Sequence, residues 1–213
     1  MYTFDHDLFL RLNFDGGPAM DASMVAFSGL AVWTPLYVLT LWLVHRRYGW
    51  RGILVFLIAV AIVVGLSDMI SSLFKGRGLL KDLLPDGFVP RPRPMYTPVL
   101  EGLDITPDSL RMLRRAAVPM DWQVHVLHTG GLYGTVSSHA ANHVAIAVLS
   151  AGVVQRRWFS VLMVLYVAAV CYSRIYLAMH FPMDLFWGTL IGIVLGSLGV
   201  WELHRSLRVR NRA

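Results

Sequence analysis

Residues 173–184 read Ser-Arg-Ile-Tyr-Leu-Ala-Met-His-Phe-Pro-Met-Asp, and they join two strongly apolar stretches of the chain. Pro182 cannot continue a helix, so the apolar helix predicted before it ends here and the next begins at Asp184. Arg174 and His180 lie in the same window. Ionisable groups at membrane depth are costly and are usually retained for a function. The window therefore predicts a junction between two membrane helices that carries chemistry.

The composition places the whole chain in a membrane. Of its 213 residues, 56% are hydrophobic and only 15% are charged, which is too apolar for an ordinary soluble domain. We expect one integral membrane domain over residues 1–213. Cys171 is the only cysteine, so no intramolecular disulfide forms. The formal charge of +6 does not indicate a nucleic-acid partner, because the basic residues lie in short loops between apolar runs.

Five apolar runs are long enough to be membrane helices rather than strands. They cover residues 24–44, 52–74, 138–154, 158–179 and 184–203. Gly188, Gly192 and Gly196 in the last run are spaced for close helix packing, and we interpret them as scaffold. The sequence therefore predicts an all-α integral membrane bundle with five clear transmembrane helices.

Two further segments differ from these runs. Residues 1–22 mix apolar and charged side chains, and Leu8, Phe9 and Leu12 share one helical face. This segment is either an interfacial amphipathic helix or a short sixth core helix. Residues 75–137 form a long connection rich in proline and charge, which is typical of a functional or disordered loop, with a short helix expected at 108–118.

The distribution of arginines predicts the orientation. They gather in the first interhelical connection, in the next loop on the same side and in the C-terminal tail. The residues are Arg46, Arg47, Arg51, Arg156, Arg157, Arg205, Arg208, Arg210 and Arg212. The positive-inside rule places these on the cytoplasmic face. The N-terminal segment, the long connection and the 180–183 turn then face the periplasm if the host is a bacterium.

This topology brings polar clusters that are distant in sequence to one membrane face. Lys75 ends the second run, His139 begins the third, His180 follows the fourth and Asp184 begins the fifth. A scatter of charges without function would have little reason to converge in this way. The convergence predicts a site on the periplasmic side.

The residue types indicate phosphate chemistry. A carboxylate at Asp184 can accept a hydrogen bond from one ring nitrogen of His180 and free the other for attack; the alternative is a helix-turn contact without chemistry. The guanidinium of Arg174 suits phosphate oxygens, although an arginine near a helix end can also snorkel to the interface. Arg91 and Arg93 lie in a proline-rich stretch that restrains them.

The start of the third run adds donors. Ser137, Ser138 and His139 lie where helix N–H groups favour an anion, and His139 is a candidate general acid. Lys75 is a further candidate phosphate ligand or a snorkelling cation. His125 and His128 have HxxH spacing, but no further ligands accompany them, so we expect no metal site and no cofactor.

At these residues the chain resembles the type-2 phosphatidic acid phosphatase superfamily of membrane lipid phosphatases. Ser173, Arg174, His180 and Asp184 match its third signature. The second signature, Pro-Ser-Gly-His, matches at Ser137 and His139, with Val136 and Ser138 in place of the proline and glycine. The Arg93-Pro94 end of the first signature is present, and an insertion separates it from its lysine, which is Lys75 or Lys81.

The resemblance implies a six-helix-type bundle and metal-independent hydrolysis through a phosphohistidine intermediate. His180 would be the nucleophile and Asp184 would orient it. His139 would protonate the leaving group and later activate water. The phosphate ligands would be Lys75, Arg93, Ser137, Ser138 and Arg174.

The expected partner is a lipid phosphate in the inner membrane; the oligomeric state is not indicated. Undecaprenyl diphosphate, hydrolysed to undecaprenyl phosphate and phosphate, is favoured. Phosphatidylglycerol phosphate, phosphatidic acid and the lipid A phosphates remain open. The alternatives are a lipid phosphotransferase of the same superfamily, a non-enzymatic anion transporter that needs Arg174 but not His180, and an oxidase resembling vanadate haloperoxidases. The membrane character argues against the last.

Overall fold

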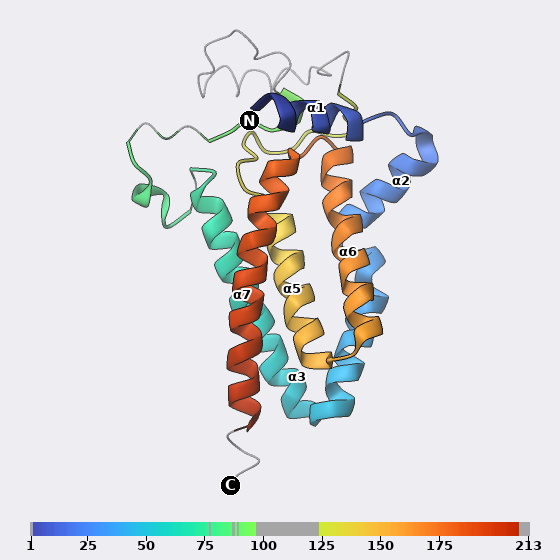
Figure 1. The fold of residues 1–213 in the computed structure, drawn as a ribbon, viewed down its shortest axis with the longest axis vertical. Helices are drawn as coiled ribbons and strands as arrows, with labels where there is room; N and C mark the ends of the chain where they lie inside the picture. The colour runs from blue at the N-terminus through green and yellow to red at the C-terminus, as the bar shows by residue number, and fades with distance from the viewer. Residues whose placement is uncertain (1, 77, 87, 89, 97–123, 209–213) are drawn as a thin grey trace.

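The computed structural model describes residues 2–76, 78–86, 88, 90–96 and 124–208. This part of the chain is helical and contains no strand; Pro92 and Tyr133 form one isolated antiparallel bridge. Figure 1 shows the long helices side by side in a bundle. In chain order the elements are α1 (Tyr2–Leu12), α2 (Gly17–Ser28), η1 (Ala31–Trp33), α3 (Thr34–Leu73), η2 (Lys81–Leu83), η3 (Pro94–Tyr96), α5 (Ser138–Val154), α6 (Arg157–Tyr176) and α7 (Pro182–Arg208).

The all-α prediction is confirmed, but the five clear spans are not. Three helices of the described part are long and apolar enough to cross a membrane: Ala31–Leu73, Arg157–Tyr176 and Pro182–Ser206. The predicted run 138–154 is α5, which is apolar but has only 17 residues. At about 1.5 Å per residue it is about 25 Å long, which is less than the roughly 30 Å hydrocarbon core.

The predicted runs 24–44 and 52–74 have different boundaries in the structure. Gly29 ends α2 with extended backbone, so the first run is interrupted before α3 begins. After η1, the α3 helix covers residues 34–73, with non-helical backbone at Gly49, where φ is 66° and ψ is −166°. Figure 1 shows the chain descending along one arm of α3 and returning along the other. A positive φ is readily adopted by glycine, which explains why the reversal is at this residue.

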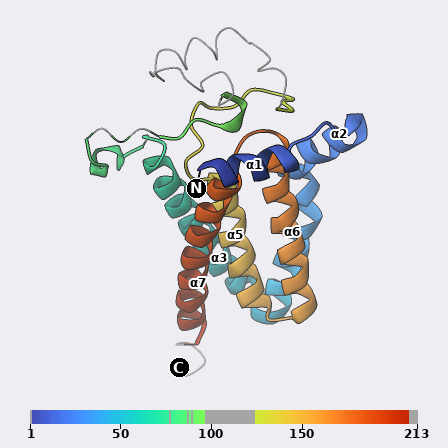
Figure 2. The same cartoon turned by 45° about the horizontal axis from the view of Figure 1, so that its top comes forward.

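The N-terminal segment forms two helices rather than one. Figures 1 and 2 show α1 lying across the ends of α6 and α7. Phe9 is buried, and Leu8 and Leu12 are partly buried, so the predicted apolar face of α1 does point toward the bundle. Phe4 on the same helix is 72% exposed. The α1 helix therefore covers the end of the bundle and does not extend its core.

The α5 and α7 helices form the most extensive contact in the bundle. A Cβ added at Gly188 would lie 2.5 Å from the Ser137 carbonyl oxygen, and one at Gly192 would lie 2.6 Å from that of Ala141. Both distances are too short for any side chain, so the glycines let the two backbones approach closely. The scaffold interpretation of these glycines is confirmed, and it matters because α5 and α7 each begin at the same end of the bundle.

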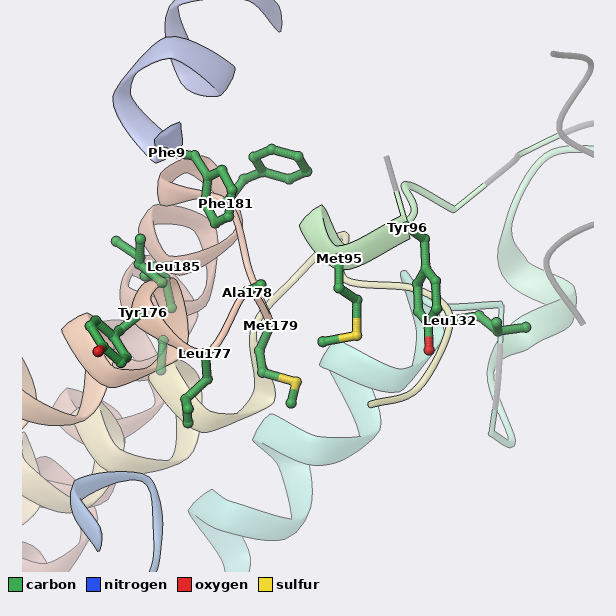
Figure 3. Close-up of a cluster of buried hydrophobic side chains, with 12 residues drawn as sticks. Phe9, Met95, Tyr96, Leu132, Tyr176, Leu177, Ala178, Met179, Phe181 and Leu185 are labelled. Atoms are coloured by element: carbon green, nitrogen blue, oxygen red, sulfur yellow. The ribbon is translucent and has the colours of Figure 1, made fainter. Parts of the chain in front are cut away.

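A cluster of buried apolar side chains supports that end. Figure 3 shows side chains from α1, from η3, from the loop near Leu132 and from the connection between α6 and α7. Phe9 packs edge-on against Phe181 with ring centroids 5.2 Å apart. Met95 and Met179 are 1% and 3% exposed. The α6–α7 connection, which contains His180, is therefore held on several sides by apolar contacts.

Candidate active site

His180 is buried at the junction of α6 and α7, where it is 1% exposed. The Arg174 carbonyl accepts hydrogen bonds from the backbone N–H groups of Met179 and His180, at 2.9 and 3.3 Å. Ala178, which lies between the end of α6 and Met179, adopts a left-handed conformation with φ of 52°. The local chain thus turns sharply and directs the His180 ring toward the loop around Gly134.

The nearest acceptor of the His180 ring is a carbonyl, not the expected carboxylate. Its Nδ1 lies 3.0 Å from the Gly134 carbonyl oxygen and 3.5 Å from Asp184 Oδ2. A carbonyl can only accept, so Nδ1 carries the proton in this hydrogen bond. The ring is then in the tautomer in which Nε2 has a free lone pair. Gly134 itself is positioned by its N–H, which donates to the Arg91 carbonyl at 2.9 Å.

Asp184 connects the junction to two other segments. Its Oδ2 accepts the Phe181 N–H at 3.1 Å, and its backbone carbonyl accepts the Ser137 N–H at 3.0 Å. Its Oδ1 lies 3.5 Å from Arg91 Nη1. Arg91 makes a shorter ion pair of 2.6 Å with Asp5 of α1. Two buried carboxylates therefore share the charge of one arginine.

The start of α5 places three of the predicted residues together. Ser137 is the N-cap, and its hydroxyl oxygen accepts the Ala140 N–H at 3.3 Å. Ser138 Oγ accepts a hydrogen bond of 2.7 Å from Lys75 Nζ. His139 follows, with its ring centroid 5.9 Å from that of His143. The end of α3 and the start of α5 therefore meet at this site.

Arg93 and Arg174 approach from different elements. Arg93 donates from Nε to the Tyr133 carbonyl at 3.3 Å and lies 3.0 Å from Met179 Sδ through Nη1. Arg174 is 6% exposed, and its Nη1 donates to Ser28 Oγ. Its Nε is buried and has no hydrogen-bond partner in the described part of the chain. A buried donor of this kind is uncommon in a native protein, and an anion would satisfy it.

The charges around His180 are mainly positive. Burial, and then the positive charges of Arg93, Arg174 and Lys75, lower the pKa of His180 well below its usual range. The His180 ring is therefore neutral at physiological pH. A neutral imidazole surrounded by cations suits attack on an anionic group that those cations also attract.

The structure brings together all eight predicted site residues at one end of the bundle. They are Lys75, Arg93, Ser137, Ser138, His139, Arg174, His180 and Asp184. The lysine next to Ser138 is Lys75. The side chain of Lys81, the other candidate for the lysine of the first signature, lies outside the described residues. The helix expected at 108–118 also lies outside them.

Sequence reasoning did not identify three contributors to the site. Gly134 supplies the carbonyl that accepts a hydrogen bond from His180. Asp5 forms an ion pair with Arg91, and the Ser28 hydroxyl accepts a hydrogen bond from Arg174. The acidic residue in the otherwise apolar face of α1 was the only available signal, because Asp5 is close in the helical register to Phe9. A glycine in a loop and a serine at the end of α2 carry no comparable signal.

One group of side chains has the geometry of a cation site. Ligand atoms of Asp15, Asp21 and His125 lie within 4.8 Å of one another; His128 is not part of the group. Asp21 Oδ1 already accepts hydrogen bonds from Tyr176 Oη at 2.5 Å and from His125 Nε2 at 2.9 Å. Asp15 Oδ1 accepts the Gly17 N–H. The direct contact between Asp21 and His125 holds these two residues together without an ion.

The helical bundle, with a cluster of histidines and cationic side chains at one end, is typical of a class of membrane enzymes that act on phosphate groups. A sequence model of the PAP2 superfamily matches residues 76–207. A lipid A 4'-phosphatase of Bacteroides thetaiotaomicron is 28% identical over 207 residues, covering 95% of this chain and 77% of the relative. A lipid A 4'-phosphatase of Porphyromonas gingivalis is 25% identical over 206 residues, covering 97% and 75%. No solved structure matches the chain significantly.

The chain belongs to the PAP2 superfamily, and it is a lipid phosphatase. The membrane-spanning helices agree with a substrate that is itself a membrane lipid.

Proposed function

We propose that this protein removes a phosphate group from lipid A or a related glycolipid, through a phosphohistidine at His180. The carrying observation is the hydrogen bond between His180 Nδ1 and the Gly134 carbonyl, which leaves Nε2 as the basic nitrogen. In the proposed reaction Nε2 attacks phosphorus, the bond from phosphorus to the lipid oxygen breaks, and His139 gives its proton to that oxygen. Water, deprotonated by His139, then hydrolyses the phosphohistidine and releases phosphate.

The cations have the proposed role of holding the phosphate during both steps. Arg174 Nε is buried without a partner in the described residues, and Lys75 and Arg93 lie around the same ring. Positive groups placed before the reaction stabilise the charge that develops on the transferring oxygens. Asp184, 3.5 Å from His180 Nδ1, would stabilise the positive charge that the ring acquires when Nε2 bonds to phosphorus. No step in this mechanism needs a metal ion.

The substrate proposal differs from the one that the sequence favoured. Undecaprenyl diphosphate has no support from the relatives, which are lipid A 4'-phosphatases. The lipid A alternative is supported by similarity that covers 95% and 97% of the chain. The arginine distribution supports an inner membrane location with the site facing the periplasm.

The test is phosphate release by detergent-purified protein, measured with and without EDTA. The panel contains bisphosphorylated lipid A, undecaprenyl diphosphate, phosphatidylglycerol phosphate and phosphatidic acid. His180→Ala is compared with His45→Ala, a histidine near the opposite end of the bundle. We expect release from lipid A, abolished in His180→Ala and retained in His45→Ala.

Each other result changes a specific part of the proposal. Release from undecaprenyl diphosphate alone would restore the earlier substrate assignment. Activity of folded His180→Ala near wild type would remove the phosphohistidine. Transfer of phosphate to a lipid acceptor with no release to water would identify a phosphotransferase, and loss of activity with EDTA would show that a metal ion takes part.

A further inference from the structure

A second basic feature lies at the opposite end of the bundle from His180. A cavity of about 550 Å³ opens where the first arm of α3 meets the connection between α5 and α6. Arg46, Arg47 and Arg156 line it, together with Gln155, Trp42 and two aliphatic side chains. None of the described residues that line the cavity is acidic. The phosphatase reaction makes no use of this cavity, because His180 and its cations are at the other end.

One of the three arginines is fixed by the backbone. Arg47 Nη1 donates to the carbonyl oxygens of Val153 and Val154, at 3.1 and 3.0 Å, and its Nη2 donates to Gln155 Oε1 at 2.5 Å. These carbonyls end α5, where Gln155 adopts a left-handed conformation with φ of 54°. All of these acceptors are neutral, so the guanidinium keeps its full charge in the wall of the cavity. A fixed cation loses little entropy when it binds an anion.

The other two arginines add charge that no carboxylate balances. Arg46 lies over the Trp42 ring, with Cζ 5.2 Å from the ring centroid. Arg156 is the exposed N-cap residue of α6. Within the described part of the chain, none of the three guanidinium groups pairs with a carboxylate. The cavity therefore concentrates positive charge and is complementary to an anion.

The surroundings of the cavity indicate an anion that carries an apolar chain. Val38, Trp42 and Arg46 are spaced four residues apart and so form one stripe along α3. Val38 and Trp42 are 59% and 51% exposed, and Trp158 at the start of α6 is 53% exposed. Along this stripe the apolar side chains are followed by a cation, just as the acyl chain of a phospholipid is followed by its phosphate headgroup. Tryptophan is also the residue preferred at the level of lipid headgroups.

We propose that this cavity binds the headgroup of an anionic phospholipid, with its phosphate between Arg46 and Arg156 and its acyl chains along the Val38–Trp42 stripe. The shared ligand chemistry is a phosphate anion. The apolar stripe favours a lipid over free phosphate. This site is independent of the proposed substrate, and its ligand is bound without being hydrolysed.

The test measures lipid binding by the detergent-purified, full-length protein. The probes are short-chain phosphatidylglycerol, phosphatidylcholine with the same chains, and inorganic phosphate. The variant is Arg46→Gln/Arg156→Gln, which leaves Arg47 and its bonds in place. The matched control is Arg205→Gln, because Arg205 lies over Trp201 at 5.6 Å in a similar arginine–tryptophan pair but does not line the cavity. The candidate active site also attracts phosphate, so the readout is the difference between variants.

We expect the double variant to bind phosphatidylglycerol about tenfold more weakly than wild type, the effect of losing roughly one charge-assisted hydrogen bond. Arg205→Gln should bind like wild type, and Arg46→Lys/Arg156→Lys should keep most of the affinity if the double glutamine variant folds poorly. Unchanged binding in a folded double variant, or an equal loss in Arg205→Gln, would overturn the proposal. Inorganic phosphate binding as tightly as the lipid, with the same dependence on Arg46 and Arg156, would overturn the lipid assignment.

Discussion

Gly134 is the single residue on which the geometry of His180 depends most closely. A Cβ added there would lie 3.1 Å from Asp184 Oδ2, 3.3 Å from Arg93 Cγ and 3.4 Å from His180 Nδ1. These neighbours would have to shift by a few tenths of an ångström, and the hydrogen bond that selects the His180 tautomer would shift with them. The absence of a side chain at this position is therefore part of the site.

We predict that Gly134→Ala lowers kcat/KM at least about tenfold, because small misplacements of reacting groups have large effects on rate. The thermal midpoint in detergent should change little. Gly65→Ala is the control, since a Cβ at Gly65 meets nothing within 4 Å. Equal activity in the two variants would show that His180 does not depend on a close approach of Gly134.

The protonation of His180 leads to a second prediction. Burial and the charges of Arg93, Arg174 and Lys75 lower its pKa, so the ring stays neutral as the pH falls below the usual histidine value of about 6.5. The acid limb of kcat/KM that belongs to the proposed nucleophile should therefore lie below that pH.

Removing one of the charges tests this assignment. Arg93→Gln should raise the pKa of His180 and move the acid limb to higher pH, in addition to lowering the rate. Both proteins are measured with the same substrate, so ionisation of the substrate contributes equally to the two pH profiles and does not affect their difference. An acid limb at the same pH in both proteins would show that another group sets it.

At the scale of elements, α1 is coupled to the site through an ion pair, a hydrogen bond and a ring contact. Asp5 is 3% exposed, and its two oxygens accept from Arg91 Nη1 at 2.6 Å and from the Met183 N–H at 3.0 Å. Phe181 also stacks on His6 of α1, with centroids 4.6 Å apart, and lies 3.7 Å from Arg91 Cζ. The N-terminal helix thus holds both the arginine and the α6–α7 junction in place.

We predict that Asp5→Asn destabilises the protein by about 1–3 kcal/mol, because it removes the charge that pairs with a largely buried arginine. Arg91 would then be drawn to Asp184, so kcat should fall as well. Asp7→Asn is the control, since Asp7 is on the same helix but exposed. Thermal unfolding and phosphate release measure the two effects, and matching values for Asp5→Asn and Asp7→Asn would show that α1 has no part in the site.

For the whole molecule, the orientation in the membrane is the property to test. Asp86 and Arg157 are exposed at opposite ends of the bundle, and Cys171 is the only native cysteine. In a Cys171→Ala background, a membrane-impermeant maleimide should label Asp86→Cys in intact spheroplasts. Arg157→Cys should be labelled only after lysis, because we propose that the arginine-rich end faces the cytoplasm. The reverse pattern would place the candidate active site on the cytoplasmic side.

The sequence by itself determined the class of the protein and, to within about three residues, the ends of its helices near the site. The apolar runs predicted an all-α bundle, Pro182 marked the junction, and Ser137 was expected at a helix start and is the N-cap of α5. The meeting of the Lys75, His139 and His180 clusters at one end also followed, because alternating helices return the chain to the same face. These features depend on composition and on spacing within or between successive elements, which the sequence displays directly.

The tertiary structure alone decided which atoms meet. Several contacts at the site join residues that are far apart in the chain, and no periodic pattern encodes such pairs. They are the contacts of the Gly134 carbonyl with His180, of Asp5 with Arg91 and of Lys75 with Ser138. The boundaries of the first two predicted runs differ from those in the structure for a related reason. Apolar runs give length, but whether Gly49 bends a helix or ends it depends on the packing of both arms of α3 against the bundle. Local sequence sets the conformations that each segment favours, and only the folded chain selects among them.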